Sequence, residues 1–144
     1  MAALDHFGIE YLIVGGVAVG FHAEPRFTKA LDVLIHVNAE NIGRVMDALR
    51  EFGAPMHFVR AEEFLRENFV FFFGSPPWRI EILTSIPGID FQAAYADRIT
   101  VTPGNSEATC ISKEWLVKAK KASGRYQDLA DLEALQSKPD AEET

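Results

Sequence analysis

A glycine pair and an acidic residue lie at a spacing that could serve phosphate chemistry. Gly15 and Gly16 follow the apolar run 11–14, and Asp32 lies within the β-branched segment 31–37. A tight glycine turn ahead of a helix lets backbone N–H groups approach phosphate oxygens. A carboxylate on a neighbouring strand can hold the metal ions that accompany such phosphates. Together these residues indicate a nucleoside-triphosphate site.

A second acidic residue and a basic segment add to this pattern. Glu81 lies within the alternating segment 78–83, and the basic segment 118–125 carries Lys120 and Arg125 ahead of Asp128. Burying an unpaired charge in an apolar strand is expensive, so an acidic residue in such a strand favours a functional role. Lysine and arginine both bind phosphate charge, and arginine does so through a bidentate fork.

Each of these features also has a purely structural interpretation. A glycine pair after a strand is usually a plain turn, and Asp32 could be solvated at a sheet edge. Glu81 could form a surface pair with Arg79, and basic segments are usually solvated helix faces. No metal-ligand spacing relates the histidines, which we expect at the surface or half-buried: His6, His22, His36 and His57. Ser75 and Cys110 lack the partners that a nucleophile needs.

The elements that must position these residues follow from hydrophobic periodicity and turn residues. The patterns predict strands over 11–14, 31–37, 68–73, 78–83, 98–102 and 108–111, with 68–73 and 78–83 paired as a hairpin. They predict helices over 17–23, 39–52, 91–95, 113–123 and 128–135, the last with Leu129, Leu132 and Leu135 facing inward. This order of elements indicates an α+β (mixed α/β) fold with a mixed sheet flanked by helices.

The composition is that of one globular domain. With 144 residues, 48% of them apolar, the chain suits a single domain with a sizeable core. We expect this domain over 1–136, followed by a polar, disordered tail over 137–144. No apolar run reaches the roughly 20 residues that crossing a bilayer requires. The N-terminus lacks a basic region, so we expect no signal peptide and a cytoplasmic protein.

The cysteine count and the net charge restrict the site and its partners. A single cysteine excludes an internal disulfide and a zinc site built on several cysteines. The net charge of -7 argues against broad nonspecific binding of nucleic acid. The basic segment 118–125 favours a local contact, so an RNA acceptor stays open without being indicated by the net charge.

Taken together, these residues resemble the nucleotidyltransferase superfamily of the polymerase-beta type. Its first motif is a Gly-Gly or Gly-Ser pair, a spacer, and then Asp-x-Asp or Asp-x-Glu on a strand; here Gly15-Gly16 precedes Ala30-Leu31-Asp32. Glu81 matches the third carboxylate of the family, on a later strand. The segment 115–135 is similar to a small prokaryotic branch that includes abortive-infection and toxin–antitoxin nucleotidyltransferases. The resemblance covers residues 11–135.

The resemblance implies a mechanism. Two Mg²⁺ ions would lie between the carboxylates and the triphosphate, one activating the attacking hydroxyl and the other stabilising the leaving pyrophosphate. The product would be a nucleoside monophosphate joined to a hydroxyl acceptor. By position, the resemblance assigns Asp32, Glu81 and Lys120 to catalysis, Asp32 and Glu81 to the metal, and Gly15, Gly16, Thr28, Lys29, Lys120, Arg125 and Asp128 to the nucleotide.

The sequence departs from the family pattern at Ala30, where the first carboxylate of the motif is expected. A methyl group cannot bind metal, and losing one strong charge-assisted contact costs about 2–4 kcal/mol, or a factor of roughly 30–1000 in rate. Three explanations are open: an engineered knock-out, natural decay, or another carboxylate such as Glu24 moving in.

Two functions therefore remain. The first is a nucleotidyltransferase that is weakened or inactive because of Ala30. The second is a non-catalytic regulator, antitoxin-like, that binds a nucleotide or a protein. A chain of this length has little room for a separate acceptor domain, so a partner protein or a homodimer could complete the site.

Overall fold

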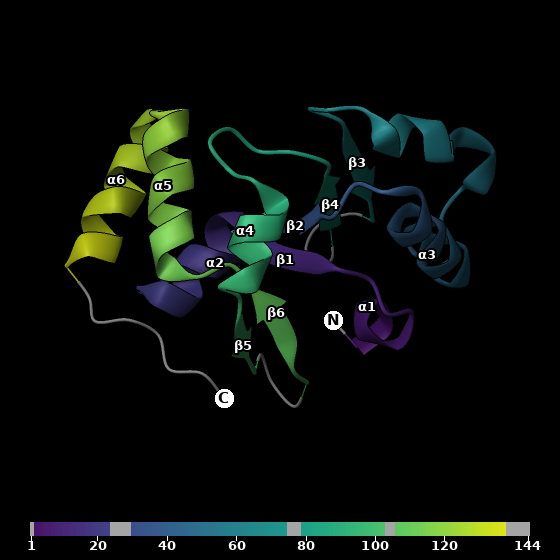
Figure 1. The fold of residues 1–144 in the computed structure, drawn as a ribbon, viewed down its shortest axis with the longest axis horizontal. Helices are drawn as coiled ribbons and strands as arrows, with labels where there is room; N and C mark the ends of the chain where they lie inside the picture. Colours follow the sequence, from purple (N-terminus) through teal and green to yellow (C-terminus); the bar gives the residue numbers. More distant parts are fainter. Residues whose placement is uncertain (1, 24–29, 75–78, 103–105, 138–144) are drawn as a thin grey trace.

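The protein forms one mixed sheet with helices packed against it. The computed structural model describes residues 2–23, 30–74, 79–102 and 106–137. Within these ranges six strands form a sheet in the order β3-β4-β2-β1-β6-β5 (Figure 1). The strands are β1 (Tyr11–Val14), β2 (Ala30–Ile35), β3 (Val70–Phe73), β4 (Arg79–Leu83), β5 (Ile99–Val101) and β6 (Ala108–Cys110). This arrangement confirms the predicted α+β class and mixed sheet.

Parallel and antiparallel pairings alternate across the sheet. Strand β2 pairs antiparallel with β1 and parallel with β4. Strands β3 and β4 form the predicted antiparallel hairpin, β5 and β6 form a second one, and β1 pairs parallel with β6. The central position of β1 explains its uninterrupted apolar sequence, because all four of its residues are buried.

The helices of the described residues are α1 (Ala2–His6), α2 (Gly15–His22), α3 (Ala39–Glu51), α4 (Phe91–Ala96), α5 (Lys113–Ser123) and α6 (Tyr126–Gln136), with 3-10 turns at Met56–Phe58 and Ala61–Leu65. Helix α2 packs on β1 and β2, and the α5–α6 pair packs on α2. The α5–α6 pair and α3 lie at opposite sides of the molecule (Figure 1). No helix of the described residues is long and apolar enough to cross a membrane.

Side-chain caps set several helix boundaries where the sequence predicted them. Asn38, Asp90 and Ser112 each accept a hydrogen bond from a backbone N–H in the first turn of the following helix. Helix α5 ends at Gly124, whose φ of 66° is the left-handed conformation that glycine adopts without strain.

Two predictions about buried side chains were wrong. Leu129 is 54% exposed, whereas Leu132 and Leu135 are buried. The buried face of α6 follows positions 128, 131, 132 and 135, and Leu129 lies outside that stripe. His22 is buried at the end of α2, where its Nε2 atom lies 2.8 Å from the carbonyl oxygen of Ile111. The residues 138–144 of the predicted tail lie outside the described part of the chain.

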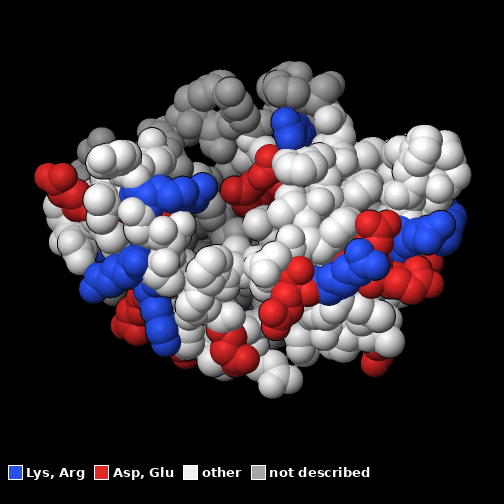
Figure 2. All heavy atoms as spheres, turned by 90° about the horizontal axis from the view of Figure 1, so that it is seen from above, with Lys and Arg blue, Asp and Glu red and all other residues white. Residues whose placement is uncertain are grey.

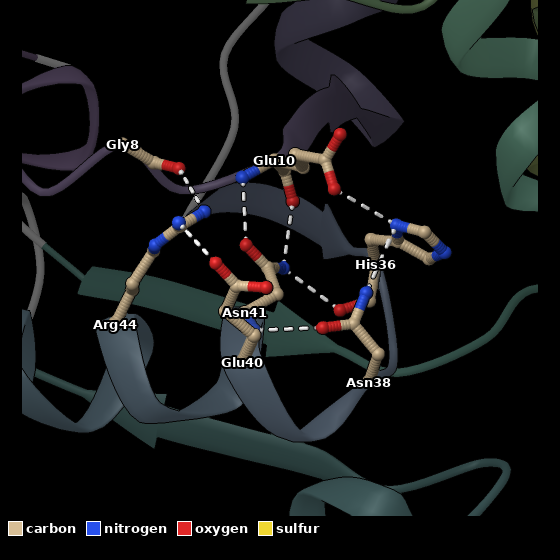
Figure 3. A network of polar contacts seen from close by, with 7 residues as sticks. All are labelled: Gly8, Glu10, His36, Asn38, Glu40, Asn41 and Arg44. Atoms are coloured by element: carbon tan, nitrogen blue, oxygen red, sulfur yellow. Dashed lines mark hydrogen bonds and ion pairs between the residues drawn. The ribbon is translucent and has the colours of Figure 1, made fainter.

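A buried asparagine joins α3 to the two central strands (Figure 3). The Asn41 side chain accepts a hydrogen bond from the Glu10 N–H at 2.8 Å and donates to the carbonyl oxygens of Glu10, at 3.1 Å, and His36, at 2.7 Å. Its own N–H donates to the Asn38 cap. One side-chain amide thus forms hydrogen bonds with backbone groups just before β1 and just after β2. These groups lie at the opposite end of the two strands from Gly15.

We expect Asn41→Ala to lower the free energy of unfolding by about 2–4 kcal/mol, because it removes the side-chain partner of the Glu10 N–H and of the His36 carbonyl oxygen, whereas the Glu10 carbonyl oxygen keeps its hydrogen bond from the His36 N–H. Denaturant unfolding measures the change. The matched control is Glu40→Ala, which removes an exposed ion pair with Arg44 and should cost less than about 1 kcal/mol. Equal losses in the two variants would contradict this account of the network.

Candidate nucleotide and metal site

Asp32 and Glu81 lie side by side on the sheet. They are direct partners in the parallel pairing of β2 and β4. Ala30 and Arg79 form the pair two residues earlier in the same register, so all four side chains lie on one face of the sheet. The structure therefore brings together the two carboxylates that the sequence predicts for the metal. Their neighbours on the same face are the methyl group of Ala30 and the side chain of Arg79.

The glycine turn lies against Asp32. Val14, the last residue of β1, pairs with Asp32, and Gly15 follows it with a φ of 68°. A Cβ atom at Gly15 would collide with the Asp32 carboxylate, and would lie 3.0 Å from Cγ and 3.1 Å from Cβ of that residue. Gly15 is thus required both for its backbone conformation and for the closeness of its backbone to the carboxylate.

Helix α2 begins at this turn without a side-chain cap. Val14 occupies the N-cap position, and no side chain there accepts a hydrogen bond from the first turn. Gly16, the second glycine of the pair, is buried. The N–H groups of the first turn of a helix have no partner within the helix and attract negative charge. An uncapped helix N-terminus therefore lies directly beside Asp32, at the place where the sequence predicts phosphate binding.

Burial and the neighbouring Glu81 carboxyl together raise the pKa of the Asp32 carboxyl from its ordinary 3.8 to about 7. The positive charges of Lys120 and Arg125 act in the opposite direction. Among the described residues, no group forms a hydrogen bond to the buried Oδ1 atom of Asp32. An oxygen that is buried, close to a like charge and unpaired is well suited to bind a cation.

Lys120 of α5 is held by two buried carboxylates of α6. Its Nζ atom lies 3.1 Å from Oδ1 of Asp128 and 3.1 Å from Oδ2 of Asp131. Asp128 also accepts a hydrogen bond of 2.8 Å from Nε of Arg125. Burial alone would raise the pKa of Asp128, but hydrogen bonds from Arg125, Ser123 and Lys120 outweigh it and hold that pKa well below the usual range. The Asp128 carboxylate therefore lies, ionised, between two basic side chains.

The basic residues of α5 and α6 lie close enough to the sheet carboxylates to act on them electrostatically. Figure 2 shows that one face of the molecule has a hollow with basic side chains on one side of it and acidic side chains on the other. The charges of both Lys120 and Arg125 act on Asp32. Lys120 is nearly buried, whereas the Arg125 side chain is 74% exposed. Arg125 is thus accessible to solvent while two of its nitrogens contact Asp128, and Lys120 contributes a fixed charge.

The donor set fits one divalent cation better than two. Asp32 and Glu81 offer carboxylate oxygens, of which Asp32 Oδ1 is unpaired, and such hard oxygens suit Mg²⁺. Ala30 offers none, and the described residues contain no group of three or more histidine, cysteine, aspartate or glutamate side chains placed to hold a metal. The predicted site for two metal ions therefore lacks one carboxylate ligand, the one expected at position 30.

The remaining sequence predictions are partly outside the described residues. Thr28, Lys29 and Glu24 lie in the range 24–29 and their placement is not described.

Two further residues belong to the site. Asp131, three positions after Asp128, shares its helix face, and that spacing was a usable signal. Arg79, two positions before Glu81 on the same strand face, lies with its guanidinium 3.6 Å from Oε1 of Glu81.

We expect Gly15→Ala to destabilise the protein by about 1–3 kcal/mol more than Gly8→Ala. The two glycines share a φ of 68°, but a Cβ at Gly8 meets nothing within 4 Å. The difference between the variants in denaturant unfolding therefore isolates the collision with Asp32. In an Asp32→Ala background that difference should shrink, because only the contact with the Cβ atom of residue 32 remains, and a difference of unchanged size would contradict the contact with the carboxylate.

The raised pKa of Asp32 predicts a pH-dependent gain in stability for Asp32→Asn. The folded state holds the Asp32 proton more tightly than the unfolded chain, so its contribution is fully present below pH 3.8 and is lost as the pH rises through about 7. Asp32→Asn should therefore raise the free energy of unfolding by about 1–3 kcal/mol at pH 8 and by little at pH 4. The exposed Asp47→Asn is the control; a pH-independent effect of Asp32→Asn would contradict the assignment.

Comparison with known proteins supports this geometry at the level of the fold. No family model matches the sequence, and no curated protein matches it either. The fold is similar to that of a protein of Thermotoga maritima assigned as a nucleotidyltransferase, TM1012 (TM-score 0.60, 14% identity, covering 92% of this chain and 84% of that one). It is similar to the lincosamide antibiotic adenylyltransferase LnuA in its lincomycin-bound form (TM-score 0.56, 14% identity, 94% and 91% covered). It is also similar to an antigenic nucleotidyltransferase-like protein from Paracoccidioides brasiliensis (TM-score 0.55, 21% identity, 94% and 70% covered). The chain therefore has the nucleotidyltransferase fold, in agreement with the resemblance in its sequence.

Proposed function

We propose that the protein binds a nucleoside triphosphate with a divalent cation at this site and transfers the nucleoside monophosphate to a hydroxyl acceptor. One observation supports the proposal: Asp32 and Glu81 are register partners on one sheet face, and Asp32 lies directly against the uncapped first turn of α2. If the carboxylate oxygens bind a cation and the N–H groups of this turn bind an anion, the two lie next to each other, as a metal–triphosphate complex requires.

The residues divide into two roles. The N–H groups at Gly15 and Gly16 would bind phosphate oxygens, and Arg125, at the start of α6, would add a bidentate contact. Lys120 is held by Asp128 and Asp131 and would act through its charge. Asp32 and Glu81 would hold the cation, which when bound supplies charge neutralisation and polarisation of phosphate oxygens.

Ala30 lowers the expected rate without removing the phosphate-binding elements. Its position, two residues before Asp32 on the same sheet face, is where a further carboxylate would reach the cation. One missing charge-assisted contact corresponds to a loss of about 2–4 kcal/mol in transition-state stabilisation, or roughly 30–1000-fold in rate. We therefore infer a slow transferase.

A second function, a non-catalytic regulator that binds a nucleotide, is favoured by a different observation. Glu81 already has a cationic neighbour in Arg79, and Ala30 offers no oxygen to draw a metal ion into the gap. Such a protein would act by changing the shape or availability of a partner protein, as an antitoxin does. Both functions include nucleotide binding. They differ in whether the protein transfers the nucleoside monophosphate to an acceptor.

We expect Ala30→Asp to increase transfer of label from α-³²P-labelled nucleoside triphosphates, in the presence of Mg²⁺ and cell extract, by roughly 30-fold or more. Ala30→Asn is the matched control, since it has the same size without the charge, and should stay at the level of the unchanged protein. The labelled species would identify the acceptor. Absence of label from both the unchanged protein and Ala30→Asp would contradict the transferase and leave the regulator.

Binding is tested separately by thermal unfolding. Mg²⁺ with ATP, CTP, GTP or UTP should raise the melting temperature for the preferred nucleotide, because a ligand that binds only the folded state stabilises it by mass action. Asp32→Asn should reduce this shift. If none of the nucleotides shifts the melting temperature, the nucleotide site itself is refuted, and with it both functions.

A further inference from the structure

One row of register partners crosses the sheet at the proposed site and ends on an exposed aromatic ring. Successive pairings place four side chains on the same face of neighbouring strands, in the order Val14, Asp32, Glu81 and Phe72. Exposure rises along this row: Val14 is 3% exposed, the Glu81 side chain 26% and Phe72 52%. The row is thus buried on β1, where α2 packs, and open on the edge strand β3.

The exposure of Phe72 is unexpected for the sequence of its strand. Phe71 and Phe73 alternate with Phe72 and pack against the core from the opposite face. Val70, two residues before Phe72, lies on the same face as Phe72, so β3 is apolar on both faces. That pattern is typical of strands that are covered on both sides, whereas an open face of an edge strand usually carries polar or charged residues. A large apolar ring at this place is therefore a candidate contact for a ligand.

The Phe72 ring is held by a neighbour on the adjacent strand. The central carbon of the Arg79 guanidinium lies 4.4 Å from the centre of the ring, and one of its nitrogens lies 3.6 Å from Oε1 of Glu81. An arginine stacked on an aromatic ring covers one of its two faces and limits its rotation. The ring therefore offers an oriented apolar surface one strand away from Glu81.

The direction of the proposed reaction indicates which substrate lies over Phe72. In the proposed site the phosphates bind at Gly15 and Gly16, next to Asp32 and away from β3. In a displacement at phosphorus, the attacking and leaving oxygens lie roughly in line on opposite sides of the phosphorus atom. A pyrophosphate that leaves toward α2 therefore requires a hydroxyl that approaches from the side of Glu81. Because neighbouring strands are about 5 Å apart, a group that rests on Phe72 is close enough to present this hydroxyl.

We propose that Phe72 binds the hydroxyl acceptor, and that this acceptor carries a planar aromatic group next to its hydroxyl. The planar group packs against the Phe72 ring. The hydroxyl oxygen forms a bond to the α-phosphorus, the bond from that phosphorus to the pyrophosphate oxygen breaks, and the hydroxyl proton passes to the Glu81 carboxylate and then to water. The inference rests on the proposed function and adds the chemical class of the acceptor to it.

The first test measures binding of an acceptor probe to the full chain by equilibrium dialysis. The probe is 2-naphthol, which is flat and carries a hydroxyl, and the solution contains Mg²⁺ and a triphosphate analogue with a methylene group between its α and β phosphorus atoms. 2-Naphthol should bind more tightly than decahydro-2-naphthol, whose rings are puckered. Phe72→Ala should weaken its binding by roughly tenfold, and Phe72→Tyr, which keeps the ring, should stay within about threefold of the unchanged protein. Equal binding of the two compounds, or no effect of Phe72→Ala, would overturn the inference.

The matched control is Phe58→Ala. Phe58 is 74% exposed, but it lies in the 3-10 turn Met56–Phe58 and not in the sheet. Its removal should leave binding of 2-naphthol unchanged, and a loss equal to that of Phe72→Ala would overturn the inference. Light scattering tests another occupant of the same surface. If the unchanged protein is a dimer and Phe72→Ala is a monomer, a second copy of the chain covers Phe72, and the inference is overturned.

The second test separates the acceptor from the nucleotide. Phe72→Ala should keep the affinity for the triphosphate analogue within about twofold. Added to Ala30→Asp, it should lower transfer of label from α-³²P-labelled nucleoside triphosphates to cell extract by roughly tenfold or more. A parallel loss of analogue affinity would mean that Phe72 contacts the nucleoside, and would overturn the inference while leaving the proposed function intact. If the unchanged protein binds no analogue and Ala30→Asp transfers no label, the proposed function itself fails, and this inference fails with it.

Discussion

The structure depends on holding two acidic side chains next to each other on a half-buried sheet face. Asp32 and Glu81 are direct neighbours, and their proximity, together with burial, raises the pKa of Asp32 to about 7. The arrangement is unfavourable in the absence of a cation, since like charges that lose water repel each other strongly. The surrounding sheet maintains it, because the backbone pairing of β2 with β4 fixes the two residues as direct neighbours. Such stored repulsion is typical of sites that bind metal or phosphate.

The remainder of the site is arranged around this pair. Gly15 lets the backbone approach Asp32, where any larger residue would push the carboxylate away. The charge of Lys120, which is fixed by Asp128 and Asp131, also acts on Asp32. Arg79 lies against Glu81. The groups that we propose for binding the nucleotide and the cation thus lie on neighbouring elements, from the start of α2 to β4.

Much of the fold could be predicted from the sequence because its signals are local. The strand from Tyr11 to Val14, the caps at Asn38 and Ser112 and the end at Gly124 depend on residues close in the chain. The site could be predicted only in part. The pairing of Asp32 with Glu81 agrees with the resemblance, but nothing in the sequence states that Arg79 is the register partner of Ala30, because register between parallel strands is a tertiary property. The exposure of Leu129 was missed for a similar reason, since the partner helix decides which stripe is buried.

The parallel pairings of the sheet have a consequence for how the site comes into being. Strand β2 meets β4 only after the intervening α3 and β3 segment has folded back, and β1 meets β6 only when almost the whole described chain is in place. Contacts between distant parts of a chain form slowly, because the loop between them must first be closed at an entropic cost. No local segment contains both carboxylates, the glycine turn and the lysine. During synthesis on the ribosome, therefore, the arrangement of the glycine turn, the two carboxylates and Lys120 would be completed only after α5 has emerged.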